Sequence, residues 1–138
     1  MPRKRIICML FNDDDFDDQE LFGHTLKHLD ISTNFVTDNL GIHAIEKERA
    51  ITTPLPHFIF VDVDSPKIEG IDCLVEIKKI SRIRNNPVYL YSTYADPKIL
   101  KEGKKRGAVD LLVKAHNMKE LEQMLSEIIL PVENNNEG

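Results

Sequence analysis

Residues 58–64 read Phe-Ile-Phe-Val-Asp-Val-Asp, and this stretch decides the fold. Four consecutive apolar residues suit a strand that is buried on both faces, because a half-exposed strand would alternate apolar and polar residues. Strands of this kind occur almost only in parallel sheets that helices cover on both sides. The stretch therefore predicts an α/β protein with a carboxylate at the end of a buried strand.

The rest of the chain alternates between strand-like and helix-like segments. Four further strands are predicted at Ile6–Phe11, at Phe35 and Val36, at Val88–Tyr91 and at Val109–Val113. Five helical segments are predicted, from their apolar spacing or from a capping Asp-Pro pair, at residues 17–29, 42–50, 71–80, from 96 onward and at 119–130. Strands that alternate with helices in this way predict a doubly wound parallel sheet with helices on both faces.

The first turn between a strand and a helix, residues 12–15, reads Asn-Asp-Asp-Asp and lacks glycine. The dinucleotide-binding type of doubly wound sheet needs glycines at this turn, so that the backbone can approach a pyrophosphate. The sequence therefore predicts the other common type, a five-stranded parallel sheet of order 2-1-3-4-5, which is the flavodoxin-like order.

Length and composition limit the classes of protein that fit. The 138 residues predict a single domain over residues 5–130, followed by a disordered polar tail over residues 131–138, with no room for an output module. The net charge of −5 argues against a nucleic-acid binder, which must neutralise phosphates. The longest apolar run has six residues, which excludes a membrane span of about 20 residues. With no signal peptide and two cysteines, we expect a reduced, cytoplasmic protein.

Polar side chains gather where the predicted strands end. Asp13 and Asp14 follow the first strand, Asp62 follows the third, Ser92 follows the fourth, and Lys114 follows the fifth. In open α/β sheets ligands bind beyond the carboxyl ends of the strands, so these side chains are expected to converge.

This combination of groups favours phosphoryl chemistry. Several carboxylates in one pocket repel one another unless a cation lies among them, and oxygen ligands favour Mg²⁺. A metal-neutralised Asp62 is suited to attack phosphorus and form an aspartyl phosphate. Lys114 and the Ser92 hydroxyl would then help to hold the phosphoryl oxygens.

Four motifs occur in this order at the strand ends: LFNDDDFDDQELF at 10–22, FIFVDVDSPKIEG at 58–70, VYLYST at 88–93 and GAVDLLVKA at 107–115. Together they resemble the CheY-like receiver domain of two-component response regulators, over about residues 5–130. The resemblance implies a phosphoryl acceptor in a phosphorelay, which receives its phosphoryl group from a sensor histidine kinase or a histidine phosphotransfer protein. It leaves the downstream protein open, and a second copy of this chain is one candidate.

The resemblance also implies a role for each matching residue. Asp13 and Asp14 correspond to the acidic pair that binds Mg²⁺, and Asp62 to the phospho-acceptor, which is also a metal ligand. The backbone carbonyl of Asp64 corresponds to a further metal ligand. Ser92 corresponds to the hydroxyl that contacts the phosphoryl group, and Lys114 to the lysine of the site.

Two positions depart from the family pattern. Ala115 follows the lysine where the family normally has a proline after a cis peptide bond, which is costly before any other residue. Leu111 stands where the family usually has an aromatic switch residue. The chemistry is expected to be intact, whereas the conformational readout is expected to be altered.

Two rival functions remain open at this point. Residues 58–65 also resemble the nucleophile motif of haloacid dehalogenase-like phosphatases, with Asp62 as nucleophile and Asp64 as general acid or base. The acidic pair precedes this motif instead of following the lysine, and no cap domain is present, which argues against that interpretation. The other rival is a receiver-like module that binds a protein and is not phosphorylated.

Some charged residues have simpler interpretations. Asp17 and Asp18 are interpreted as helix-start residues that are favourable to the helix dipole. His24 and His28 are spaced like metal ligands on a helix, but the sequence offers no third ligand for a zinc site. A basic cluster is interpreted first as a solvated helix face and second as a docking surface; it comprises Lys98, Lys101, Lys104, Lys105 and Arg106.

Overall fold

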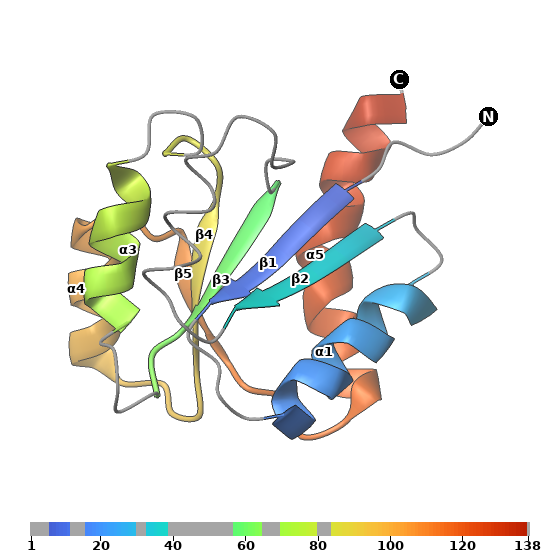
Figure 1. Ribbon diagram of the computed structural model, residues 1–138, viewed down its shortest axis with the longest axis horizontal. Helices are drawn as coiled ribbons and strands as arrows, with labels where there is room; N and C mark the ends of the chain where they lie inside the picture. Colours follow the sequence, from blue (N-terminus) through green and yellow to red (C-terminus); the bar gives the residue numbers. More distant parts are fainter. Residues whose placement is uncertain are drawn as a thin grey trace.

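The computed structural model describes residues 6–11, 16–29, 33–38, 57–64, 70–79 and 84–137. Its centre is a five-stranded parallel sheet with strand order β2-β1-β3-β4-β5 (Figure 1). The strands are β1 (Ile6–Phe11), β2 (Thr33–Asp38), β3 (Phe58–Asp62), β4 (Val88–Ser92) and β5 (Asp110–Val113). The predicted fold class and the predicted strand order are confirmed.

Helices cover both faces of this sheet (Figure 1). The described helices are α1 (Phe16–His28), α3 (Gly70–Lys78), α4 (Pro97–Lys105) and α5 (Met118–Glu137). Helices α1 and α5 lie on one side, and α3 and α4 lie on the other. The helix predicted at residues 42–50 lies outside the described residues.

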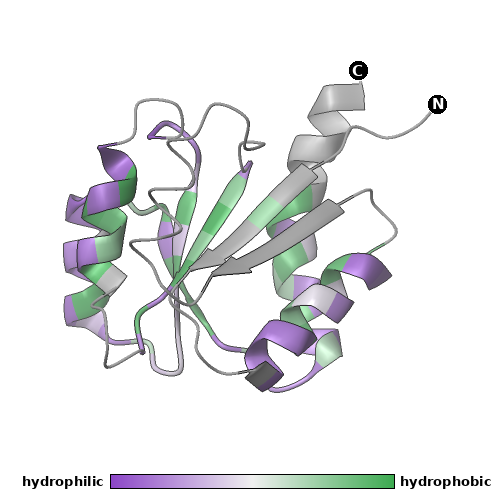
Figure 2. Ribbon diagram, in the orientation of Figure 1, coloured by the Kyte–Doolittle hydropathy of each residue, from purple (hydrophilic) through white to green (hydrophobic). Residues whose placement is uncertain are grey.

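Strand β3 is buried along its whole length, and its alternate residues enter two different cores. Ile59 and Val61 pack with apolar residues of α3 and β4, and Phe58 and Phe60 pack with those of α1 and α5. Figure 2 shows β3 green along most of its length, whereas α1 and α3 carry both green and purple residues, as helices with one apolar side should. The strand predicted from residues 58–61 is therefore buried on both faces, and it brings Asp62 to the edge of the sheet.

Helix α4 begins where the sequence predicts it. Asp96 is the N-cap, its carboxylate accepts a hydrogen bond from the Lys98 backbone N–H at 2.9 Å, and Pro97 is the first helical residue. The turn after the helix contains Gly107, whose φ of 108° is favourable for glycine alone among common residues.

Helix α5 differs from its prediction, because it continues to Glu137. The disordered tail predicted for residues 131–138 is therefore helical as far as residue 137. The polar composition of this segment argues against burial, but helical hydrogen bonds are local and need no apolar side chains. In the described part of the chain, no helix has both the length and the apolar content that crossing a bilayer requires.

Candidate functional site

The carboxyl ends of β3, β4 and β5 bring three of the predicted site residues together. Asp62 is the last residue of β3 and Ser92 is the last of β4, and their exposed fractions are 2% and 5%. Lys114 directly follows β5, and its backbone N–H donates to the Ser92 carbonyl at 2.7 Å. This bond extends the β4–β5 pairing past the strand and fixes the point from which the lysine side chain departs.

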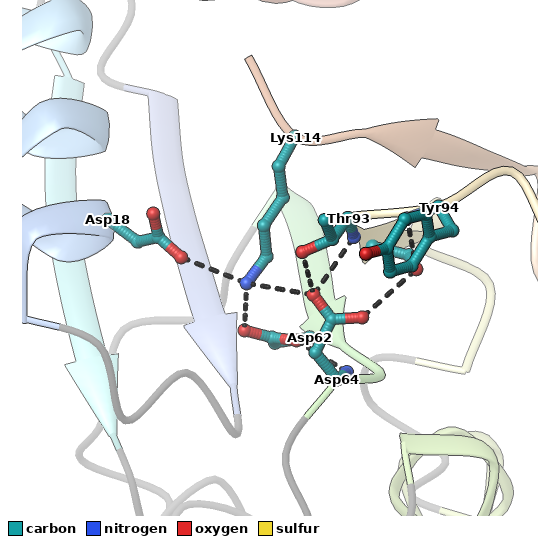
Figure 3. A network of polar contacts seen from close by, with 7 residues as sticks. Asp18, Asp62, Asp64, Thr93, Tyr94 and Lys114 are labelled. Carbon is teal, nitrogen blue, oxygen red and sulfur yellow. Dashed lines mark hydrogen bonds and ion pairs between the residues drawn. The ribbon is translucent and has the colours of Figure 1, made fainter. Parts of the chain in front are cut away.

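The ammonium of Lys114 lies among three carboxylates (Figure 3). Nζ donates to Asp62 Oδ2 at 2.7 Å and to Asp18 Oδ2 at 2.9 Å, and it lies 3.3 Å from Asp64 Oδ2. It also lies 5.7 Å from the centre of the Tyr91 ring, within cation–π range. Among the described residues, this cluster sets three carboxylates around one ammonium.

The Asp62 carboxylate is held at both oxygens. Oδ2 accepts from Lys114, and Oδ1 accepts from the Asp64 backbone N–H at 2.7 Å. Burial raises the pKa of Asp62, and this effect exceeds the opposing effects of the Lys114 and Asp64 donors. The carboxylate is thus both desolvated and oriented, as a nucleophile at a strand end should be.

The side chain of Asp64 makes contacts that the sequence did not predict. Its Oδ2 accepts from the Thr93 hydroxyl at 2.6 Å and from the Thr93 backbone N–H at 2.9 Å, and its Oδ1 accepts from the Ser92 hydroxyl at 3.1 Å. Burial acts to raise the pKa of Asp64, but the Thr93 hydrogen bonds and the Lys114 charge outweigh it and bring the pKa below its ordinary value. The signal in the sequence was a second aspartate after one strand and a second hydroxyl after the next.

The interpretation of Asp18 as a helix-start residue alone is incomplete. Asp18 does lie in the first turn of α1, where a carboxylate is favourable to the helix dipole. Its carboxylate also pairs with Lys114, which follows β5 and lies 96 positions later in the chain. The first turn of α1 therefore contributes directly to the site.

The predicted metal site comprises Asp13, Asp14, Asp62 and the backbone carbonyl of Asp64. Asp13 and Asp14 lie outside the described residues, and among the described residues no group of three His, Cys, Asp or Glu side chains could hold a metal ion. The donors that are described, Asp62 and Asp64, offer only oxygen atoms, and within the described residues they share one ammonium with Asp18. This donor chemistry fits Mg²⁺, a hard cation that prefers carboxylate and carbonyl oxygens and needs few protein ligands.

The remaining candidate residues lie apart from this cluster. His28 Nδ1 lies 3.0 Å from Glu122 Oε2, which links α1 to α5. Leu111 is half-buried and packs on the core beside α3, and Ala115 packs on the core beside α1 and α5. No peptide bond in the described part of the chain is cis, so the one that joins Lys114 to Ala115 is trans.

Comparison with known proteins gives one family and many structures. The family described as "Response regulator receiver domain" matches residues 9–126. Chemotaxis response regulator CheY4 of Vibrio cholerae is 23% identical, with 91% of this chain and 100% of that chain covered and a TM-score of 0.74. The response regulator domain of Thermotoga maritima CheB is also 23% identical, with 95% and 98% covered and a TM-score of 0.74.

A third structure, the CheX-CheY-BeF3-Mg²⁺ complex from Borrelia burgdorferi, is 20% identical, with 89% of this chain and 88% of that chain covered and a TM-score of 0.72. No curated protein sequence matches this chain. At these identities the structures establish the fold, and the match over residues 9–126 establishes the family.

Proposed function

This chain belongs to the response regulator receiver domain family, and we propose on that basis that it accepts a phosphoryl group on Asp62. Receiver domains are signalling modules rather than turnover enzymes, so the haloacid dehalogenase-like interpretation of Asp62 and Asp64 is wrong. The phosphorylated domain would signal through its surface to a downstream protein, and a second copy of this chain is one candidate.

The observation that carries the proposal is the environment of Asp62. A carboxylate that is 2% exposed lies 2.7 Å from the Lys114 ammonium at the carboxyl edge of the sheet. The Ser92 hydroxyl lies at the end of the neighbouring strand. A buried carboxylate with one cation and a neighbouring hydroxyl matches the needs of phosphoryl transfer, in which the protein positions groups and balances charge.

The reaction would form one bond and break one bond. A carboxylate oxygen of Asp62 attacks the phosphorus of a phosphohistidine, the P–N bond breaks, and its electron pair remains on the imidazole nitrogen. Lys114 balances the charge of the transferred group, and the Ser92 hydroxyl donates to one of its oxygens. Bound Mg²⁺, held by Asp62, the Asp64 carbonyl, Asp13 and Asp14, would supply further charge stabilisation.

A sensor histidine kinase or a histidine phosphotransfer protein is the proposed donor, since either carries a phosphohistidine. A Borrelia burgdorferi relative was solved in complex with CheX, BeF3 and Mg²⁺, and we extend the Mg²⁺ dependence to this chain. Three carboxylates of the described residues lie at the site, and a phosphoryl donor is itself negatively charged. We therefore expect the donor to bind there together with a cation such as Mg²⁺.

Intact-mass measurement tests the proposal directly. Incubation with acetyl phosphate and Mg²⁺ should add the mass of one phosphoryl group, and EDTA should abolish the addition. Asp62→Asn should remain unmodified, whereas Asp96→Asn should label like the wild type, because Asp96 only caps α4. Undiminished labelling of Asp62→Asn would contradict the assignment. No labelling of the wild type would favour a receiver-like module that binds a partner without phosphate.

A further inference from the structure

The carboxylate of Asp64 is surrounded by hydrogen-bond donors. Ser92 Oγ, Thr93 Oγ1 and the Thr93 backbone N–H all donate to it, at 3.1, 2.6 and 2.9 Å respectively. The Lys114 ammonium lies 3.3 Å from the same carboxylate. Such a set of converging donors is an anion-binding site, and in this structure its anion is the side chain of Asp64 (Figure 3).

This anion site is shared with Asp62. Lys114 Nζ lies within hydrogen-bond distance of Asp62 and within ion-pair distance of Asp64, so the two carboxylates meet at one nitrogen. Two of the donors around Asp64, Ser92 Oγ and Lys114 Nζ, are the ones that a phosphoryl group on Asp62 would use. The donors of the proposed reaction are therefore already engaged before any phosphoryl group arrives.

We propose that Asp64 is an autoinhibitory residue, whose carboxylate occupies the anion site and must leave it before a phosphoryl group on Asp62 can be held. This inference rests on the proposed function of Asp62. It assigns to the Asp64 side chain a role separate from that of its backbone carbonyl.

Counting donor protons supports the competition. A serine or threonine hydroxyl has one proton to donate, and the protons of Ser92 and Thr93 are both directed at Asp64. The ammonium of Lys114 has three protons, and three carboxylates lie around it, those of Asp18, Asp62 and Asp64. A phosphoryl oxygen can gain the Ser92 hydroxyl as a donor only if Asp64 loses it.

Charge acts in the same direction. A phosphoryl group adds negative charge beside the Asp64 carboxylate, which already shares the Lys114 ammonium with two other carboxylates of the described residues. Two anions at one site repel, so the Asp64 carboxylate and the phosphoryl group disfavour each other. Replacing Asp64 by asparagine removes this repulsion and keeps a side chain of nearly the same shape.

Binding of beryllofluoride, a phosphoryl mimic, measures the competition. In the presence of Mg²⁺, Asp64→Asn should bind beryllofluoride about tenfold more tightly than the wild type, since a hydrogen bond to a charged group contributes enough for such a factor. Asp96→Asn is the matched control, because it removes one negative charge from the neighbouring loop and asparagine also caps a helix. Its affinity should equal that of the wild type.

Thr93→Val gives a second, independent variant. It removes the hydroxyl that holds Asp64, so it should also raise the affinity for beryllofluoride. The expected gain is about threefold, which corresponds to the lower end of the free energy that one hydrogen bond contributes. In the double variant with Asp64→Asn, this gain should disappear, because the hydroxyl then has no carboxylate to hold. Additive effects in the double variant would overturn the inference.

The outcomes also separate this inference from the proposed function. Wild type that is phosphorylated, together with an Asp64→Asn variant that binds beryllofluoride no more tightly, overturns the autoinhibitory role alone. If both proteins are phosphorylated and Asp64→Asn binds beryllofluoride about tenfold more tightly than the wild type, both proposals are supported. If neither protein binds beryllofluoride or takes a phosphoryl group, the proposed function fails and the autoinhibitory role fails with it.

Discussion

Lys114 is the residue on which the electrostatic balance of the site depends. Its side chain is 13% exposed and its ammonium pairs with Asp62, whose side chain is 3% exposed. Removing one partner of such a pair leaves an uncompensated charge with little access to water. The pair is therefore costly to break, even though its net contribution to the intact fold is small.

We expect Lys114→Ala to fold but to lose about 2 kcal/mol of unfolding free energy, because the neighbouring carboxylates then lack their cation. Urea unfolding in EDTA measures this loss. Lys79→Ala is the control: its ammonium pairs with Glu76 on an exposed helix surface, where a substitution should change stability by less than about 0.5 kcal/mol. Equal losses of unfolding free energy in the two variants would show that the ion pairs of Lys114 contribute no more to stability than an exposed pair does.

A second residue-scale prediction concerns Cys8 in β1, which is fully buried. Burial raises the pKa of its thiol to about 12, from an ordinary value of 9.0. Above pH 9.0 the unfolded chain releases this proton while the folded chain keeps it, so unfolding becomes more favourable as the pH rises. At pH 10 the effect should be about 1.4 kcal/mol.

Urea unfolding at pH 8 and pH 10 checks this prediction. The loss of stability between the two pH values should be smaller in Cys8→Ala than in the wild type, because the other titrating groups are common to both proteins. The native thiol should also resist alkylation at pH 8, since the thiolate is the reactive form. An equal alkaline loss of stability in both proteins would contradict the raised pKa of Cys8.

At the residue scale, the sequence predicts those residues of the site whose positions are determined by the end of a strand. Asp62, Ser92 and Lys114 could be predicted because each directly follows or ends a strand, and parallel strands end at one edge. The contacts of Asp18 and of the Asp64 side chain could not. They depend on the reach of Lys114 across to α1 and on the path of the backbone after β3 and β4.

At the element scale, helix α4 packs closely on β4 at Gly103. A Cβ atom at this position would lie 2.4 Å from Leu90 Cδ1, in a side chain that is fully buried. Glycine inside a helix normally costs stability relative to alanine, so its presence here reflects the short distance between helix and sheet. Leu90 could make room only by displacing its neighbours in the core.

We therefore expect Gly103→Ala to destabilise the protein by about 1–2 kcal/mol, although alanine favours helices. Thermal unfolding measures the effect. Lys101→Ala is the control, because Lys101 lies on the exposed side of the same helix and its replacement should be neutral or slightly stabilising. A stabilised Gly103→Ala variant would show that the core adapts without cost.

The elements themselves follow from local signals to different degrees. The start of α4 is fully specified by its Asp-Pro pair, and β3 by its apolar run. The start of β5 differs by one residue, since Val109 precedes the strand and is 49% exposed. The end of α5 was missed because the prediction followed the helical spacing of apolar residues, which stops at Leu130.

At the scale of the whole molecule, one sheet separates two cores, and the site lies at the edge where both end. The loop of residues 93–96 runs from the site to α4: Thr93 is bound to Asp64, and Asp96 caps the helix. A change at Asp64 can therefore reach α4 through the Thr93 hydrogen bonds and the short stretch of chain that follows Thr93. Leu111, by contrast, packs on the core beside α3 and lacks the polar tip of an aromatic switch residue such as tyrosine.

This arrangement leads to a prediction about how the signal leaves the site. A switch needs two arrangements that the phosphoryl group distinguishes in energy. We expect the described arrangement, with Thr93 bound to Asp64, to be the resting one, and phosphorylation to release the loop of residues 93–96. The face of α4 would then move, presenting its basic cluster, Lys98 to Arg106, to an acidic partner or to a second copy of this chain.

NMR shift mapping with beryllofluoride and Mg²⁺ measures this movement. Shifts should extend over residues 92–106 and leave Leu111 nearly unchanged, and Asp62→Asn should show none of them. In Asp64→Asn, where the loop has already lost its charged partner, part of the same shifts should appear before beryllofluoride is added. Shifts that centre on Leu111 and β5, with residues 92–106 unmoved, would contradict this prediction. The loop would then have kept its resting contacts although the phosphoryl mimic is bound, and the signal would have to cross the sheet by way of β5.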